Sequence, residues 1–216
     1  MTQPPEMFIV AGPQGGGKSA VFSPGRFADR IFNADDRAAE LNGGSYSAIP
    51  IELRRQVNVE FEAFVRDSIA QRRSFALETT LRSRITFEQA RAARLSGFQV
   101  IMTYVALDSF ASHLERVTQR ARRGGHSASE STLRRIHASS LANLSACLRP
   151  EESGFDELRI YDNSIPGGAP RLALTALKGK VIYLASDLPG WLQNALTWSD
   201  SDVAKIRKDL AYSFGA

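Results

Sequence analysis

The sequence predicts an α/β fold in which three layers, α/β/α, are built around a mainly parallel sheet. Short apolar runs alternate with helical patterns along the 216 residues, and a glycine-rich loop directly follows the first apolar run. Parallel strands need crossover connections, and the helical segments between the apolar runs supply them. The expected strands are Met7–Ala11, Arg30–Asn33, Phe75–Leu77, Gln99–Ala106 and Leu158–Tyr161.

The helices between these strands are predicted from apolar spacing and from end signals. In the first of them Leu53, Val57 and Phe61 recur at helical spacing. Gly97 suits a left-handed cap at the end of the second, and the capping-box pattern from Ser127 to Glu130 starts the fourth. The expected ranges are 51–71, 87–95, 109–123 and 127–148.

The last fifty residues are predicted to be an extension packed on the same domain. Short strands over 171–174 and 181–184 would form a hairpin around Lys178-Gly179. Pro189 would lie in the first turn of a helix over 190–196, and a further helix would cover 203–212. We therefore expect a core over residues 1–164, with a lid at 109–148, and a C-terminal extension over 165–216.

The composition is ordinary for a soluble globular protein, with 43% hydrophobic and 23% charged residues. No apolar run approaches the ~18 residues of a membrane span, and the first six residues lack the features of a signal peptide. The single cysteine, Cys147, rules out an internal disulfide and fits a reducing compartment. These observations predict a cytoplasmic protein without a membrane partner.

The chain is basic, with a formal net charge of +4 and a pI near 9.5. Six arginines fall between Arg116 and Arg135, and no aromatic residue is interleaved with them. A single-strand nucleic-acid surface would need aromatic side chains on which bases stack. Because arginine binds phosphate oxygens well, the cluster favours a polyphosphate ligand over nucleic acid.

The run Gly12-Pro13-Gln14-Gly15-Gly16-Gly17-Lys18-Ser19 fits the phosphate-loop pattern G-x-x-x-x-G-K-[ST]. Its glycines allow the backbone to curl around phosphate oxygens and to point N–H groups at them. Lys18 would reach the terminal phosphates, and the Ser19 hydroxyl would ligate Mg²⁺. The helix that follows, from Ala20, would add partial positive charge at its N-terminus. The loop therefore predicts binding of a nucleoside triphosphate.

Two carboxylates follow expected strands at the edge of the sheet where ligands bind. The second strand ends at Asn33-Ala34-Asp35-Asp36, and the third leads into Glu78-Thr79-Thr80. Phosphoryl transfer to a hydroxyl needs a group that orients or deprotonates the nucleophile. Asp35 and Glu78 are the candidates for this chemistry, although an acidic residue in such a position is also a common helix cap.

Arg116, Arg120 and Arg123 are spaced by four and then three residues, which places them on one face of a helix. Such a stripe would neutralise charge on a phosphoryl group in transfer. The alternative is a solvated face, paired with nearby carboxylates. The glycines at 124 and 125 would form a hinge, with Arg134 and Arg135 beyond it as further contributors.

With these motifs in this order along the chain, the sequence resembles the zeta-toxin family of P-loop kinases, in its compact bacterial form. The likeness extends over residues 7–164. Besides the loop, the matching pieces are Asn33-Ala34-Asp35, Leu77-Glu78-Thr79-Thr80, Arg116-Val117, Arg120, Gly124-Gly125-His126, Leu141-Ala142-Asn143-Leu144 and Tyr161-Asp162-Asn163-Ser164.

The resemblance implies a P-loop kinase-like fold and transfer of phosphate from ATP, with Mg²⁺, to a small-molecule hydroxyl. The best-known acceptor is the 3′-hydroxyl of UDP-N-acetylglucosamine, and a small antitoxin that covers the ATP site would be the protein partner. Lys18 and Ser19 would hold phosphates and metal, Asp35 would be the base, and Glu78 with Thr79 would bind the acceptor.

By the same resemblance Arg116 is a phosphate-binding lid arginine. The second lid arginine stays open among Arg120, Arg123, Arg134 and Arg135, because the spacing differs from that of longer members. Asp36 lies beside Asp35, so the assignment of the base stays open between these two residues. His113 and His137 lack metal-ligand spacing and are expected to have packing or surface roles.

Two other functions remain open from the sequence. The acceptor would be a different metabolite in the first, such as another nucleotide-sugar, a nicotinamide nucleotide or an antibiotic. In the second, the chain would be an ATP-binding module that transfers nothing.

Overall fold

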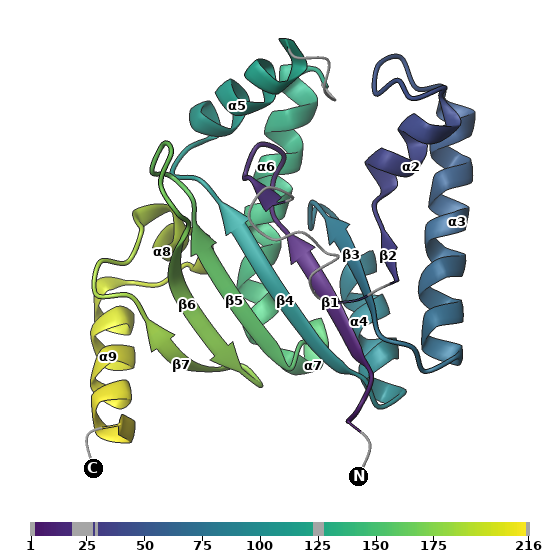
Figure 1. Ribbon diagram of the computed structural model, residues 1–216. Coiled ribbons are helices and arrows are strands. Elements are labelled where there is room, and N and C mark those ends of the chain that lie inside the picture. The colour runs from purple at the N-terminus through teal and green to yellow at the C-terminus, as the bar shows by residue number, and fades with distance from the viewer. Residues whose placement is uncertain (1–2, 19–27, 29, 123–127, 215–216) are drawn as a thin grey trace.

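The computed structural model describes residues 3–18, 28, 30–122 and 128–214, and a mixed sheet of seven strands runs through it (Figure 1). The order across the sheet is β2-β3-β1-β4-β5-β6-β7; the first five strands pair in parallel and the last two are antiparallel. The strands are β1 (Glu6–Ala11), β2 (Ile31–Phe32), β3 (Phe75–Thr79), β4 (Gln99–Ala106), β5 (Glu157–Asp162), β6 (Arg171–Leu177) and β7 (Lys180–Leu184).

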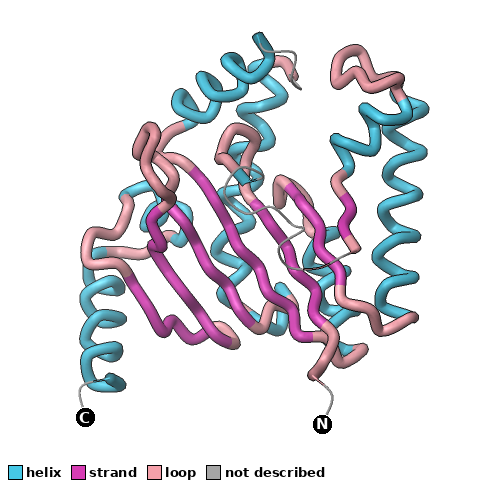
Figure 2. Tube along the Cα trace, in the orientation of Figure 1, coloured by secondary structure: helices cyan, strands magenta, loops and turns pink. Residues whose placement is uncertain are grey.

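Among the described residues, helices connect β2 to β3, β3 to β4 and β4 to β5, and further helices follow β7 (Figure 2). Five of those expected from the sequence have their counterparts in α3, α4, α5, α8 and α9, and the fourth expected helix is divided into α6 and the short 3-10 helix η2. The described helices are α2 (Ala34–Leu41), α3 (Ile51–Ala70), α4 (Ile85–Leu95), α5 (Phe110–Arg122), α6 (Glu130–Leu144), η2 (Ser145–Leu148), α7 (Pro150–Ser153), α8 (Gly190–Leu196) and α9 (Asp200–Phe214).

The central strand β4 is buried on both faces, which confirms the predicted three-layer α/β/α arrangement with a mainly parallel sheet. Val100, Met102 and Tyr104 belong to the main hydrophobic cluster, and the alternate residues of the strand are buried as well. The Tyr104 hydroxyl lies 2.9 Å from Ser140 Oγ of α6, and its ring packs near Trp191 of α8. Figure 1 shows α4, α6 and α7 behind this part of the sheet.

Helix α2 was not expected from the sequence, which placed Asp35 and Asp36 on a chain segment following the second strand. Asn33 is instead the N-cap of α2, and its Oδ1 accepts hydrogen bonds from Asp35 N at 3.0 Å and Asp36 N at 3.3 Å. Both aspartates therefore lie in the first turn of a helix, where carboxylates are favoured by the helix dipole.

The start of α6 also differs from the sequence prediction. The N-cap is Ser129, whose hydroxyl accepts a hydrogen bond from Thr132 N, and Glu130 is the first helical residue. Ser127, from which the capping box was expected to start, lies outside the described residues. The short helix α7 was not expected either.

The two strands of the C-terminal segment, β6 and β7, extend the sheet beyond β5. Strands β6 and β7 are joined at Lys178-Gly179, whose φ angles of 47° and 78° suit a two-residue hairpin turn. Asp162, at the end of β5, accepts a hydrogen bond from the Trp191 indole at 3.1 Å and pairs with Arg171 at 3.7 Å. Pro189 is the N-cap of α8, one position before the first turn in which it was expected. The division of the chain at residue 164 stays a prediction.

Within the described part of the chain, no helix combines the length and the apolar character needed to span a membrane.

Candidate active site

The phosphate loop follows β1 at the carboxyl edge of the sheet, with β3 on one side of β1 and β4 on the other. Helices α2 and α5 project beyond this edge on the two sides of the loop (Figure 1). The sequence-predicted groups of α2, β3 and α5 therefore reach one region from separate elements. This is the position in which open parallel sheets bind their ligands.

The loop backbone is packed so closely that two glycines are required by their surroundings. At Gly12, with φ of 135°, a Cβ would overlap the carbonyl oxygen of Val105 on β4. At Gly17, with φ of 92°, a Cβ would overlap the side-chain amide of Asn163. The curled path of the loop is thus held by contacts with β4 and with the segment after β5.

Lys18 is buried, with 7% of its surface exposed, and its ammonium group faces the loop. Nζ donates to Gly12 O at 2.8 Å and to Pro13 O at 3.2 Å, and lies 3.6 Å from Glu78 Oε1. Burial lowers the pKa of Lys18, while the charges of Glu78 and Asp35 act in the opposite direction. The structure thus brings together the predicted phosphate-binding lysine and the predicted carboxylate of β3.

Asn163 joins the loop to helix α5. Its Nδ2 donates to Gly16 O at 2.9 Å, and its carbonyl oxygen accepts a hydrogen bond from Arg116 Nη2 at 2.8 Å. Sequence reasoning matched Asn163 to a family pattern but gave it no role in the site. Its contact with Gly16 spans 147 residues, so no local signal could have found it.

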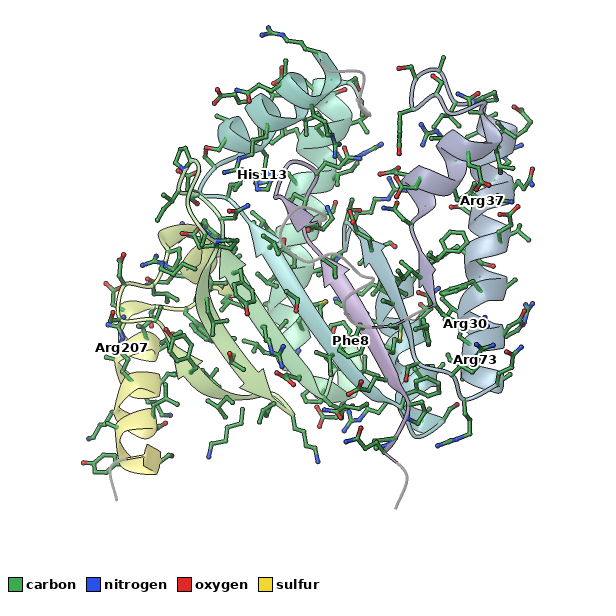
Figure 3. All side chains as sticks on the ribbon, viewed as in Figure 1. Phe8, Arg30, Arg37, Arg73, His113 and Arg207 are labelled. Atoms are coloured by element: carbon green, nitrogen blue, oxygen red, sulfur yellow. The ribbon has the colours of Figure 1, made fainter. Side chains whose placement is uncertain are left out.

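His113 is a second residue at the loop to which sequence reasoning gave no role in the site. It is buried on α5, and its ring bonds to Gln14 O of the loop at 2.9 Å and to Leu107 N at 3.0 Å (Figure 3). Packing, one of the roles expected from the sequence, is therefore only part of what His113 does. One sequence signal was available: His113 lies four residues before the buried Val117, on the inward face of α5.

The structure separates the two aspartates of α2. Asp36 is exposed, and its Oδ1 accepts a hydrogen bond from the Tyr46 hydroxyl at 2.8 Å. The pKa of Tyr46 is raised, and the hydrogen bond to Asp36 is the largest cause. Asp35 is half-buried and interacts electrostatically with Lys18. Of the two, Asp35 therefore acts on the ammonium group at the loop.

Thr79 points to the opposite face of β3 from Glu78, since successive residues of a strand alternate. Its hydroxyl accepts a hydrogen bond from Leu81 N at 3.2 Å and lies 3.4 Å from Thr86 Oγ1. These bonds shape the turn after β3. A role for Thr79 in binding the acceptor stays a prediction.

The arginines of the predicted lid take different positions. Arg116 reaches the loop through Asn163, and the exposed Arg120, one turn later, interacts electrostatically with Lys18 and Tyr46. Arg134 pairs with Glu130 at 2.7 Å and lies 4.2 Å from the centre of the Phe110 ring. Arg135 lies on α6 and is exposed. Ser19, Ala20, Arg123 and the hinge expected at 124 and 125 lie outside the described residues.

Comparison with known proteins gives a distant relative and several similar structures. No protein-family profile matches the chain. An uncharacterized protein of Haemophilus influenzae is 25% identical over 119 residues, which cover 55% of this chain and 82% of that protein.

Two similar structures come from paired or toxin–antitoxin systems. A chain of the PezAT chromosomal toxin–antitoxin system of Streptococcus pneumoniae superposes with a TM-score of 0.57 at 14% identity, over 97% of this chain and 89% of that one. A chain of the AvrRxo1-ORF1:AvrRxo1-ORF2 complex has a TM-score of 0.62 at 12% identity, over 96% and 75%. This complex has also been solved with ATP and with sulphate ions. At such identities the likeness shows the fold alone, a three-layer α/β/α arrangement around a mainly parallel sheet.

Proposed function

We propose that this chain is an ATP-dependent kinase that transfers the γ-phosphoryl group to a hydroxyl of a small molecule. The observation that carries the proposal is the convergence of Lys18, Asp35, Glu78 and Arg116 from four separate elements at one edge of the sheet. Phosphoryl transfer is catalysed mainly by positioning and by charge neutralisation, and these are the groups that it needs.

On the donor side, the loop amides and Lys18 would hold the phosphates of ATP. Lys18 Nζ now bonds to two neutral carbonyl oxygens, which anionic phosphate oxygens would replace favourably. Arg116 lies beside Gly17 and would neutralise charge on the γ-phosphoryl group as it moves. Arg120, further along the same helix, would be the second lid arginine.

Mg²⁺ is usually held by phosphate oxygens, water and one or two protein oxygens. The oxygen groups present fit this requirement, since the Asp35 and Glu78 carboxylates both act on Lys18 at the loop. Ser19 would be its ligand from the loop. The ion, when bound with ATP, would supply further positive charge to the phosphates.

On the acceptor side, Asp35 would orient the hydroxyl and take its proton. As the oxygen of that hydroxyl forms its bond to the γ-phosphorus, the bond to the β-phosphate oxygen breaks and ADP leaves. Glu78, which lies 3.6 Å from Lys18, would bind the acceptor beside the transferred group.

We further propose a nucleotide-sugar as the acceptor, with the 3′-hydroxyl of UDP-N-acetylglucosamine as the first compound to test. Support comes from the sequence resemblance alone. The similar chain of the PezAT system supports a second proposal, that the protein acts as a toxin with a small antitoxin partner. Other metabolite acceptors, or ATP binding without transfer, are the alternatives that the assay separates.

The test is transfer of label from [γ-³²P]ATP, with Mg²⁺, to UDP-N-acetylglucosamine, to a panel of other acceptors and to a bacterial metabolite extract. We expect a labelled product that disappears with Asp35→Asn and with Lys18→Ala but persists with Asp36→Asn. If the wild type labels nothing in any of these mixtures, the kinase proposal is wrong. Labelling of another compound, but not of UDP-N-acetylglucosamine, would overturn the proposed acceptor and leave the kinase proposal in place.

Toxicity is tested separately by inducing the chain in bacteria. We expect growth arrest by the wild type, relief by Lys18→Ala, and arrest again with Lys178→Ala, a substitution in the distant hairpin turn. Growth that is unaffected by the wild type would contradict the toxin proposal.

A further inference from the structure

Both ring nitrogens of His113 are used inside the fold. The Leu107 N–H donates to Nε2 at 3.0 Å, and Nδ1 lies 2.9 Å from the carbonyl oxygen of Gln14. An N–H can only donate and a carbonyl can only accept, so Nε2 must be unprotonated and Nδ1 must carry the proton. The two partners thus fix both the tautomer and the plane of the ring.

The surroundings keep this imidazole neutral. His113 is 2% exposed, and burial lowers its pKa to about 3. That value includes the bond to the Gln14 carbonyl, which acts in the opposite direction, and the charges of His137, Lys18 and Arg116, which act in the same direction as burial. A protonated ring would lose the bond from Leu107, because both of its nitrogens would then be donors.

The ring lies against the part of the loop that surrounds the phosphates. A Cβ on Gly16 would be 3.5 Å from Cε1 of His113, and one on Gly15 would be 2.5 Å from its carbonyl oxygen. The same helix carries Arg116, three residues later, which bonds to Asn163 and through it to Gly16. The loop and the first turns of α5 are therefore tied together at two points.

We propose that His113 is a positioning residue for ATP: its Nδ1–H holds the phosphate loop at Gln14 and fixes the loop to the helix that carries Arg116. This inference rests on the proposed function, because it takes the loop to be an ATP site. It adds a named group, outside the phosphate-loop pattern, on which the shape of the loop depends.

The experiment measures the dissociation constant of MgATP by calorimetry, which needs no acceptor. His113→Phe keeps a planar ring and removes both hydrogen bonds. In His113→Asn the amide Nδ2 takes the place of Nδ1 and can still donate to Gln14, whereas His113→Gln places its amide at the position of Nε2. His137→Phe is the matched control, since the His137 ring packs 4.9 Å from that of His113 and 5.5 Å from that of Phe110, on the helical side of the cluster.

We expect MgATP to bind about tenfold more weakly to His113→Phe and to His113→Gln, because both variants leave the Gln14 carbonyl of the loop without its donor. Binding should be within about threefold of the wild type for His113→Asn and unchanged for His137→Phe. Should His113→Phe fail to fold, the contrast between the Asn and Gln variants decides the same question.

Equal binding by the Asn and Gln variants, or wild-type binding by His113→Phe, would overturn the inference, because His113 would then act through packing alone. A wild-type protein that binds no MgATP would instead overturn the proposed function. The two failures are therefore distinguishable.

Discussion

The donor side and the acceptor side of the candidate site are held in different ways. The loop from Gly12 to Lys18 is bonded to groups of β3, α5 and the segment after β5. Helix α2 instead packs on α3 through a small separate cluster formed by Ala38, Ile49 and Val57 with their neighbours.

A partly exposed ion pair adds to the contact between α2 and α3. Arg37 of α2 bonds to Glu60 of α3 at 2.6 Å, and Figure 3 shows Arg37 on the outer side of the molecule. At Gly43 and Gly44, after α2, an added Cβ would meet nothing within 4 Å. The difference teaches that the proposed ATP side is tied to the elements of the central sheet, whereas the proposed acceptor side is attached through a smaller cluster and can change with fewer consequences for the fold.

The largest contrast expected is between the two aspartates of α2. Asp35→Asn should lower the rate of transfer by about 10²–10⁴-fold, the usual contribution of a positioned base. Asp36→Asn should change it by less than about threefold, because Asp36 is exposed and bonds to Tyr46. Steady-state rates with the identified acceptor measure both losses. A larger loss for Asp36→Asn than for Asp35→Asn would make Asp36 the base.

Alanine substitutions at Gly12 and Gly43 should lower the free energy of unfolding by different amounts. Gly12→Ala would force a Cβ into the Val105 carbonyl, at a cost of about 3 kcal/mol or more in the free energy of unfolding. Gly43→Ala meets no atoms, and its φ of 66° should cost only about 1 kcal/mol. Urea unfolding of both variants tests this, and similar losses would show that the two sides are packed alike.

Acid should weaken the donor side through His113. The unfolded state binds a proton there below about pH 6.5, while the folded state stays neutral to about pH 3, so stability falls as the pH drops between these values. Between pH 7 and 5 the wild type should lose about 2 kcal/mol more than His113→Phe. Urea unfolding at the two pH values measures the difference, and equal losses would mean that the ring is protonated in the fold.

The smallest effect is expected on the acceptor side, at Tyr46. Tyr46→Phe removes one partly exposed hydrogen bond to Asp36 and should raise the KM of the acceptor by less than about threefold, without changing the KM of ATP. Titration of each substrate at saturation of the other separates the two constants. A larger change in the KM of ATP would contradict the division of the site into two sides.

The sequence was sufficient for the strand order along the chain and for the main helices, because apolar periodicity and end signals are local properties. Its main error lay at residues 33–36. A two-residue strand followed by an eight-residue helix is too short to leave a clear period, and Asn33, expected to end a strand, is the cap of α2. The short helix α7 was missed for the same reason.

By itself the sequence determined the phosphate loop, since its eight residues are contiguous and their spacing reflects one ligand chemistry. Only the tertiary structure decided that Asp35 acts on Lys18 while Asp36 bonds to Tyr46, and that His113 and Asn163 hold the loop. The physical reason is that these choices depend on bonds between segments up to 147 residues apart in the chain, whose relative positions are set when the sheet assembles.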